Sequence, residues 1–119
     1  MNDKIEVLRN ETFAITCIKE LFASSKMNGS LLNILLNKEA CERFIQAKYR
    51  KAILKEVDPQ ISYSDLKIAC LNGTSIPRYY DTIIFWDNRA FIVTNYWYGP
   101  TTRMPDNRTP FLQWIKKQL

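Results

Sequence analysis

Residues 82–98 read TIIFWDNRAFIVTNYWY, and this stretch decides the fold. It contains two runs of β-branched and aromatic residues, which favour extended strands. The runs are separated by Asp87, Asn88 and Arg89, and Asp and Asn tolerate the backbone dihedral angles of tight turns. We therefore predict a β-hairpin with strands at residues 82–86 and 90–98. Because neighbouring positions in both strands are apolar, we expect other elements to cover both faces.

The chain before the hairpin contains patterns typical of helices. Apolar residues recur three, four or seven apart in residues 3–25, which predicts one helix there. Ser30 is positioned to cap a short helical turn at residues 31–36. Asn37 is a good cap for a longer helix, which we expect to continue until Asp58-Pro59 disrupts helical geometry. After this proline, residues 66–71 are predicted as a further strand.

After the hairpin, residues 99–110 contain three prolines and several hydroxyl side chains, as expected for a loop. A helix is predicted to begin at Thr109-Pro110, because proline suits the first helical position. These elements predict an α+β fold in which N-terminal helices pack on a small antiparallel sheet with a C-terminal helix. A chain of 119 residues has the length of one domain, which we assign to residues 1–119.

Composition limits where the protein acts. The chain is 46% hydrophobic and 24% charged, as in globular domains. It contains no apolar stretch long enough for a membrane span, and its first residues lack the apolar segment of a signal peptide. Three widely spaced cysteines, Cys17, Cys41 and Cys70, favour a reducing compartment. We therefore expect a cytoplasmic protein that does not associate with membranes.

Several kinds of chemistry are disfavoured by the residues that the chain lacks. It has no histidine, which is the commonest general base and metal ligand. Its three glycines are isolated, so neither a phosphate loop nor a dinucleotide-binding motif is present. Acidic residues are sparse after Asp58, whereas a two-metal nuclease needs a convergent acidic cluster. We expect no cofactor and no metal, and the pattern favours binding over catalysis.

The net charge of +5 favours phosphate-bearing or acidic partners. Five cations belong to the predicted long helix, and three of them, Lys48, Lys51 and Lys55, would align on one side of it. That stripe could follow a phosphate backbone. Alternatively, it is an ordinary solvated helix face on which the cations alternate with glutamates.

The C-terminal half combines arginine with tyrosine and tryptophan in predicted loops. Arginine binds phosphate through a rigid fork of donors, and aromatic faces stack on nucleobases. Aromatic residues of a sheet also serve as core, and Thr109 or Asn107 could simply cap the last helix. The candidate ligand-binding residues are Arg78, Tyr80, Arg89, Tyr96, Tyr98, Arg103, Asn107 and Arg108.

Three hypotheses about function follow. The first is a binding module for an anionic ligand, either a nucleotide or RNA, that uses the arginine and aromatic loops. The second is a protein-binding inhibitor of the immunity or anti-defence type, with an acidic protein as its partner. The third is a histidine-free, toxin-type ribonuclease that uses Arg78, Tyr80, Arg103 and Arg108. An exposed strand edge could also make the protein a homodimer.

Overall fold

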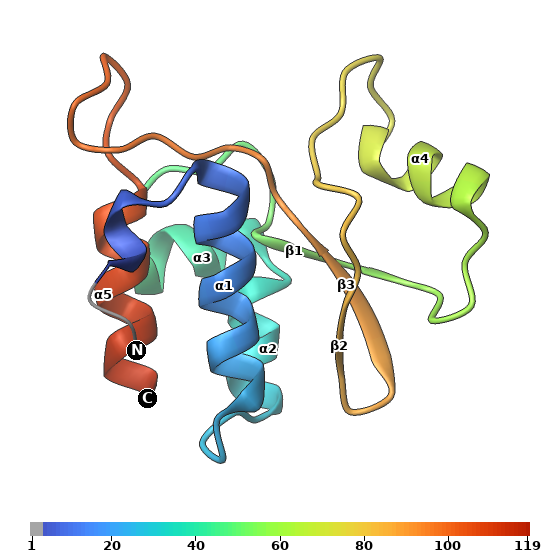
Figure 1. Cartoon of the computed structure of the whole chain (residues 1–119), viewed down its shortest axis with the longest axis horizontal. Helices are drawn as coiled ribbons and strands as arrows, with labels where there is room; N and C mark the ends of the chain where they lie inside the picture. Colours follow the sequence, from blue (N-terminus) through green and yellow to red (C-terminus); the bar gives the residue numbers. More distant parts are fainter. Residues whose placement is uncertain (1–3) are drawn as a thin grey trace.

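A computed structural model describes residues 4–119 and has an α+β fold, as predicted. Three antiparallel strands form a sheet in the order β1-β3-β2. Helices precede the sheet, interrupt it once and follow it (Figure 1). The elements are η1 (Ile5–Val7), α1 (Asn10–Ala23), α2 (Gly29–Leu35), α3 (Lys38–Ile45), β1 (Leu54–Val57), α4 (Tyr63–Leu71), β2 (Ile84–Trp86), β3 (Arg89–Val93) and α5 (Arg108–Gln118).

The predicted hairpin is confirmed. Trp86 pairs with Arg89, so the turn consists of Asp87 and Asn88 alone. Both turn residues have positive φ, 53° and 59°, as the favoured two-residue hairpin turn requires. Arg89 therefore belongs to β3, not to the turn. β3 ends at Val93, so the strand is shorter than the predicted 90–98.

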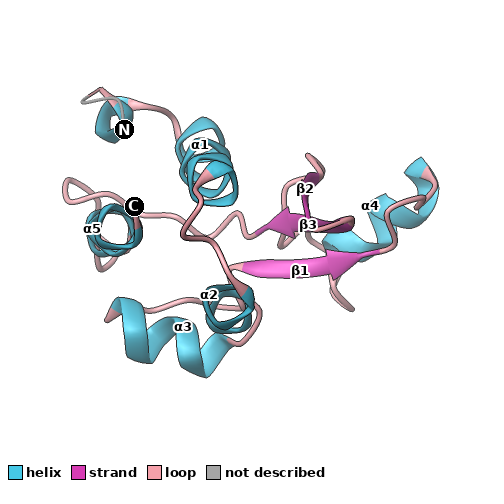
Figure 2. Ribbon diagram, turned by 90° about the horizontal axis from the view of Figure 1, so that it is seen from below, coloured by secondary structure: helices cyan, strands magenta, loops and turns pink. Residues whose placement is uncertain are grey.

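The prediction that both faces of the hairpin are covered is correct for β3 but not for β2, where Phe85 is 57% exposed. Phe91 and Val93 face the main core, which contains side chains from α1, α2, α3 and α5. Ala90 and Ile92 point the opposite way and join a smaller core with Leu66 and Cys70 of α4. α4 accordingly lies across the sheet from the other helices, as Figure 2 shows. The central strand β3 is thus buried on both sides.

The prediction of one helix at residues 3–25 is wrong in its first part. Residues 1–3 lie outside the described part of the chain, η1 is a single turn, and α1 begins only at Asn10. Arg9 precedes α1 in an extended conformation. The cause is a tertiary contact, because the backbone oxygens of Glu6 and Leu8 accept hydrogen bonds from Arg108.

The predicted long helix after Asn37 is also wrong. Asn37 does cap α3, since its side chain accepts a hydrogen bond from the Ala40 N–H. However, α3 ends at Ile45, and Gln46 adopts a left-handed conformation with φ of 63°. Residues 46–53 form a loop and residues 54–57 are strand β1, so Lys48, Lys51 and Lys55 do not share a helix face.

Two further local predictions require correction. Residues 66–71 form most of helix α4, not a strand. Ser62 caps this helix at its start, and Lys55 of β1 donates to the Ala69 carbonyl oxygen near its end. At α2, the capping residue is Asn28 and not Ser30, because the Leu31 N–H donates to the Asn28 side chain. A helix terminus stabilised in these ways outweighs weak strand propensity.

The C-terminal helix is confirmed as α5. It begins at Arg108, so Pro110 is its third residue and not its first. The segment between β3 and α5 crosses the end of the molecule where the loop between α3 and β1 also lies (Figure 1). Within residues 4–119, no helix has the length and apolar character needed to cross a membrane.

Candidate functional site

Asn107 fixes the segment between β3 and α5. Its side chain is almost fully buried, with 1% of its surface exposed. The side-chain amide donates to the carbonyl oxygens of Lys48 and Tyr96, and its oxygen accepts from the Tyr98 N–H. One buried side chain therefore joins the first part of the loop after α3 to the segment of residues 94–107. We call this first part, residues 46–51, the 46–51 loop.

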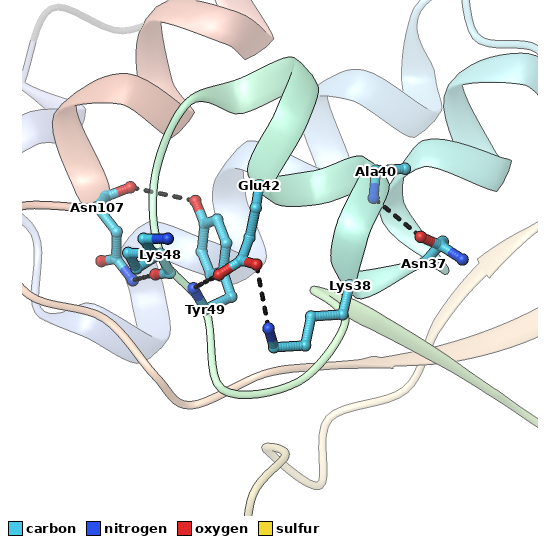
Figure 3. A network of polar contacts seen from close by, with 7 residues as sticks. All are labelled: Asn37, Lys38, Ala40, Glu42, Lys48, Tyr49 and Asn107. Carbon is cyan, nitrogen blue, oxygen red and sulfur yellow. Dashed lines mark hydrogen bonds and ion pairs between the residues drawn. The ribbon is translucent and has the colours of Figure 1, made fainter.

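Tyr49 and Glu42 hold the 46–51 loop from the other side, as Figure 3 shows. The buried Tyr49 hydroxyl donates to the Asn107 carbonyl oxygen at 3.3 Å. Glu42 accepts from the Tyr49 N–H at 3.1 Å and pairs with Lys38 at 3.0 Å. The Tyr49 N–H, and then Lys38, lower the pKa of the Glu42 carboxyl, while burial raises the pKa of Tyr49. The loop is fixed, although no helix or strand contains it.

This anchoring brings a cation and two aromatic rings together. The Arg50 guanidinium lies over the Tyr96 ring, 5.1 Å from its centroid. Tyr96 and Tyr98 contact edge to face, with ring centroids 5.0 Å apart. Arg50 is exposed and both tyrosines are partly exposed. We call this trio the Arg50–Tyr96–Tyr98 cluster.

Arg108 occupies a different environment from Arg50. Its guanidinium stacks on Phe13 at 4.1 Å and donates to the Asn10 side chain as well as to the Glu6 and Leu8 carbonyl oxygens. Burial lowers the pKa of Arg108. These contacts tie α5 to the start of α1, and they use donors that a ligand would need.

The N-terminus of α5 already has an acceptor. The Asp106 carboxylate accepts from the N–H groups of Arg108 and Thr109 at 3.0 Å each. Neither Asn107 nor Thr109, the two residues considered from the sequence, plays this role, and Asn107 instead bonds backwards to residues 48, 96 and 98. The expected anion site at this terminus is therefore occupied by a side chain of the protein itself.

The remaining candidate residues are not gathered at one place. Arg89 makes a two-pronged ion pair with Glu56 across the sheet. The Arg78 carbonyl oxygen accepts from the Asn95 N–H, and the Arg78 Nε is buried without a hydrogen-bond partner in the described chain. Burial raises the pKa of Tyr80 to about 12. Arg103 is exposed in the loop before α5.

Sequence reasoning placed three relevant cations on the wrong element. Lys48, Arg50 and Lys51 fall within the long helix predicted between Asn37 and Asp58, but they lie beside the buried Tyr49 in the 46–51 loop. No glycine or proline between residues 38 and 57 signals that α3 stops at Ile45. The stop depends on Glu42 and Asn107, whose tertiary bonds no local pattern reveals.

The chemistry available at this end of the molecule is binding by charge and stacking. Among residues 4–119, no group of three or more histidine, cysteine, aspartate or glutamate side chains is positioned to hold a metal ion. Comparison with protein-family models, with curated proteins and with solved structures gives no match to this chain. Inference about function therefore starts from the geometry of the Arg50–Tyr96–Tyr98 cluster.

Proposed function

We propose that the protein binds single-stranded RNA on the surface formed by the 46–51 loop and residues 94–107. The observation that carries this proposal is the Arg50–Tyr96–Tyr98 cluster, in which the guanidinium lies 5.1 Å from the Tyr96 ring and that ring contacts Tyr98 at 5.0 Å. Base stacking on such rings contributes about 1–3 kcal/mol per base and tolerates many sequences. Arginine adds a donor fork for phosphate beside the stacked base.

The charge around the cluster supports a polyanionic ligand. Lys48 and Lys51 flank Arg50 on the same loop, and Arg103 belongs to the facing segment. Within residues 4–119, the three ion pairs use other cations, namely Lys38, Lys67 and Arg89. The cations near the cluster are therefore available to neutralise phosphates. Because they come from two loops on an exposed surface, they suit a strand with repeated phosphates better than one free nucleotide.

The test is fluorescence anisotropy with a labelled twelve-nucleotide oligouridylate at several salt concentrations. We expect Tyr98→Ala to weaken binding about tenfold, since it removes one stacking platform. Arg50→Ala is expected to weaken binding by a smaller factor and to reduce the slope of log affinity against log salt by about one phosphate contact. Arg89→Ala is the matched control, because Arg89 is already paired with Glu56 and should leave RNA binding unchanged.

Three outcomes would contradict the proposal. Equal losses in the Arg50 and Arg89 variants would mean that only net charge matters, with no role for the cluster. Tight binding of adenosine monophosphate without binding of the oligonucleotide would show a nucleotide site instead. If neither binds, the exposed apolar residues on and after α4, Tyr63 at 69%, Ile68 at 65% and Ile76 at 59%, favour a protein interface.

A further inference from the structure

A cavity of about 490 Å³ lies between the start of α1 and α5, and residues 99–101 form part of its lining. Its apolar lining includes the exposed Pro100 and the edge of Leu112, while the Phe13 ring lies beneath the Arg108 guanidinium. Thr101 and Thr109 contribute hydroxyl groups, and Lys116 contributes an ammonium group. Small-molecule sites commonly have volumes of about 300–1,000 Å³ and combine such apolar walls with a few polar groups.

One face of α5 supplies much of the polar lining. Thr109, Gln113 and Lys116 are spaced four and three residues apart, so they lie along the same side of the helix. No hydrogen bond within the described chain uses the Thr109 hydroxyl, the Gln113 amide or the Lys116 ammonium group. These groups are therefore free to contact a ligand that lies along α5.

The charges at the cavity are mainly positive. Arg108 and Lys116 both line it, and Glu6 is the one acidic residue among the lining side chains. Since the Arg108 donors are largely engaged, Lys116 is the charge available to an incoming anion.

We propose that this cavity binds a small organic anion with an aromatic or aliphatic body and a single carboxylate or phosphate group. The body lies against Pro100 and Leu112, and the anionic group contacts Lys116 and the hydroxyls of Thr109 and Thr101. The N–H groups at the start of α5 play no part, because Asp106 already accepts from them. The proposal goes beyond RNA binding and does not depend on it, since the lining of the cavity includes neither Arg50, Tyr96 nor Tyr98.

The experiment is an NMR titration of the ¹⁵N-labelled full chain with benzoate, phenyl phosphate and neutral benzyl alcohol. We expect benzoate or phenyl phosphate to shift the amide signals of residues 99–101 and 109–116, and to bind severalfold more tightly than benzyl alcohol. The two anions distinguish a carboxylate site from a phosphate site. Absence of binding by both anions, or shifts confined to other regions, would overturn the proposal.

Three variants sharpen the titration. Gly99→Leu should reduce anion binding at least tenfold by filling the cavity, and it should fold, because a Cβ at Gly99 would meet only Arg108 Cδ, at 3.9 Å. Lys116→Gln should weaken binding about threefold, as expected for one exposed ion pair. Lys117→Gln is the matched control, since Lys117 lines a different hollow. Unchanged binding in a folded Gly99→Leu variant would exclude this cavity, whereas Arg50→Ala should leave benzoate binding intact whether or not the protein binds RNA.

Discussion

Arg108 at the start of α5 and Arg50 in the 46–51 loop make the same kind of aromatic contact, yet the structure uses them differently. Each guanidinium stacks over an aromatic ring, Arg108 at 4.1 Å over Phe13 and Arg50 at 5.1 Å over Tyr96. Arg108 is partly buried and bonds to three acceptors, whereas Arg50 is exposed. An arginine beside an aromatic ring therefore indicates a ligand site only when its donors remain free. The same residue types otherwise stabilise the fold.

Asn107 joins the 46–51 loop to residues 94–107, and its removal should have the largest effect. Asn107→Ala deletes three hydrogen bonds and leaves the carbonyl oxygens of Lys48 and Tyr96 and the Tyr98 N–H without partners. We expect a loss of about 3 kcal/mol in the free energy of unfolding, because each unsatisfied buried group costs about 1–3 kcal/mol and the site can relax. Urea denaturation followed by tryptophan fluorescence measures this loss.

Asn95→Ala is the control for that measurement. Asn95 makes one side-chain hydrogen bond, to the Pro77 carbonyl oxygen, at an exposed position. Its removal should cost about 0.5 kcal/mol. If both asparagine variants lose equal stability, Asn107 is not the anchor of the two regions.

The hairpin and the end of α3 differ in how well the sequence predicts them. The hairpin is visible from the sequence because its information is local: β-branched and aromatic flanks surround an Asp-Asn pair that accepts positive φ. The end of α3 is invisible because its information is non-local. Gln46 takes the left-handed conformation without being glycine, and Glu42 then bonds to Tyr49, seven residues ahead. A local pattern therefore continues the helix to residue 58, where the structure has a loop and a strand.

The candidate site follows the same division. Tyr96, Tyr98 and Arg103 could be selected from sequence because aromatic and arginine residues gather in one loop-rich stretch. The roles of Arg108 and Arg89 could not be read from sequence, because their partners are distant along the chain. The Leu8 carbonyl oxygen is 100 residues from Arg108, and Glu56 is 33 residues from Arg89. The sequence does not predict that Arg50 contacts Tyr96, because the local pattern assigns Arg50 to a helix and not to the 46–51 loop.

Arg108→Ala should have the next largest effect on stability. It removes the stacking contact with Phe13 and three hydrogen bonds to the start of the chain, for a loss of about 2 kcal/mol after allowance for partial exposure. Arg50→Ala is the matched comparison and should cost less than about 0.5 kcal/mol, since Arg50 is exposed and only stacks. Thermal unfolding of both variants compares them directly. Equal losses would remove the distinction between a structural and an available arginine.

Glu42→Gln should have a smaller effect on stability than Asn107→Ala or Arg108→Ala, and one that depends on pH. Its carboxylate holds the 46–51 loop through the Tyr49 N–H, and this bond lowers the pKa of Glu42 in the folded state. A lowered folded-state pKa means that the stabilisation is complete above the ordinary glutamate pKa of about 4.3 and is lost as the pH falls through the folded value. We expect Glu42→Gln to cost about 1 kcal/mol at pH 7, and the difference from the unsubstituted protein to shrink toward zero below pH 4. Urea denaturation across this pH range measures it, with the exposed Glu20→Gln as control. A difference that stays constant with pH would show that the carboxylate charge of Glu42 does not hold the loop on which Arg50 lies.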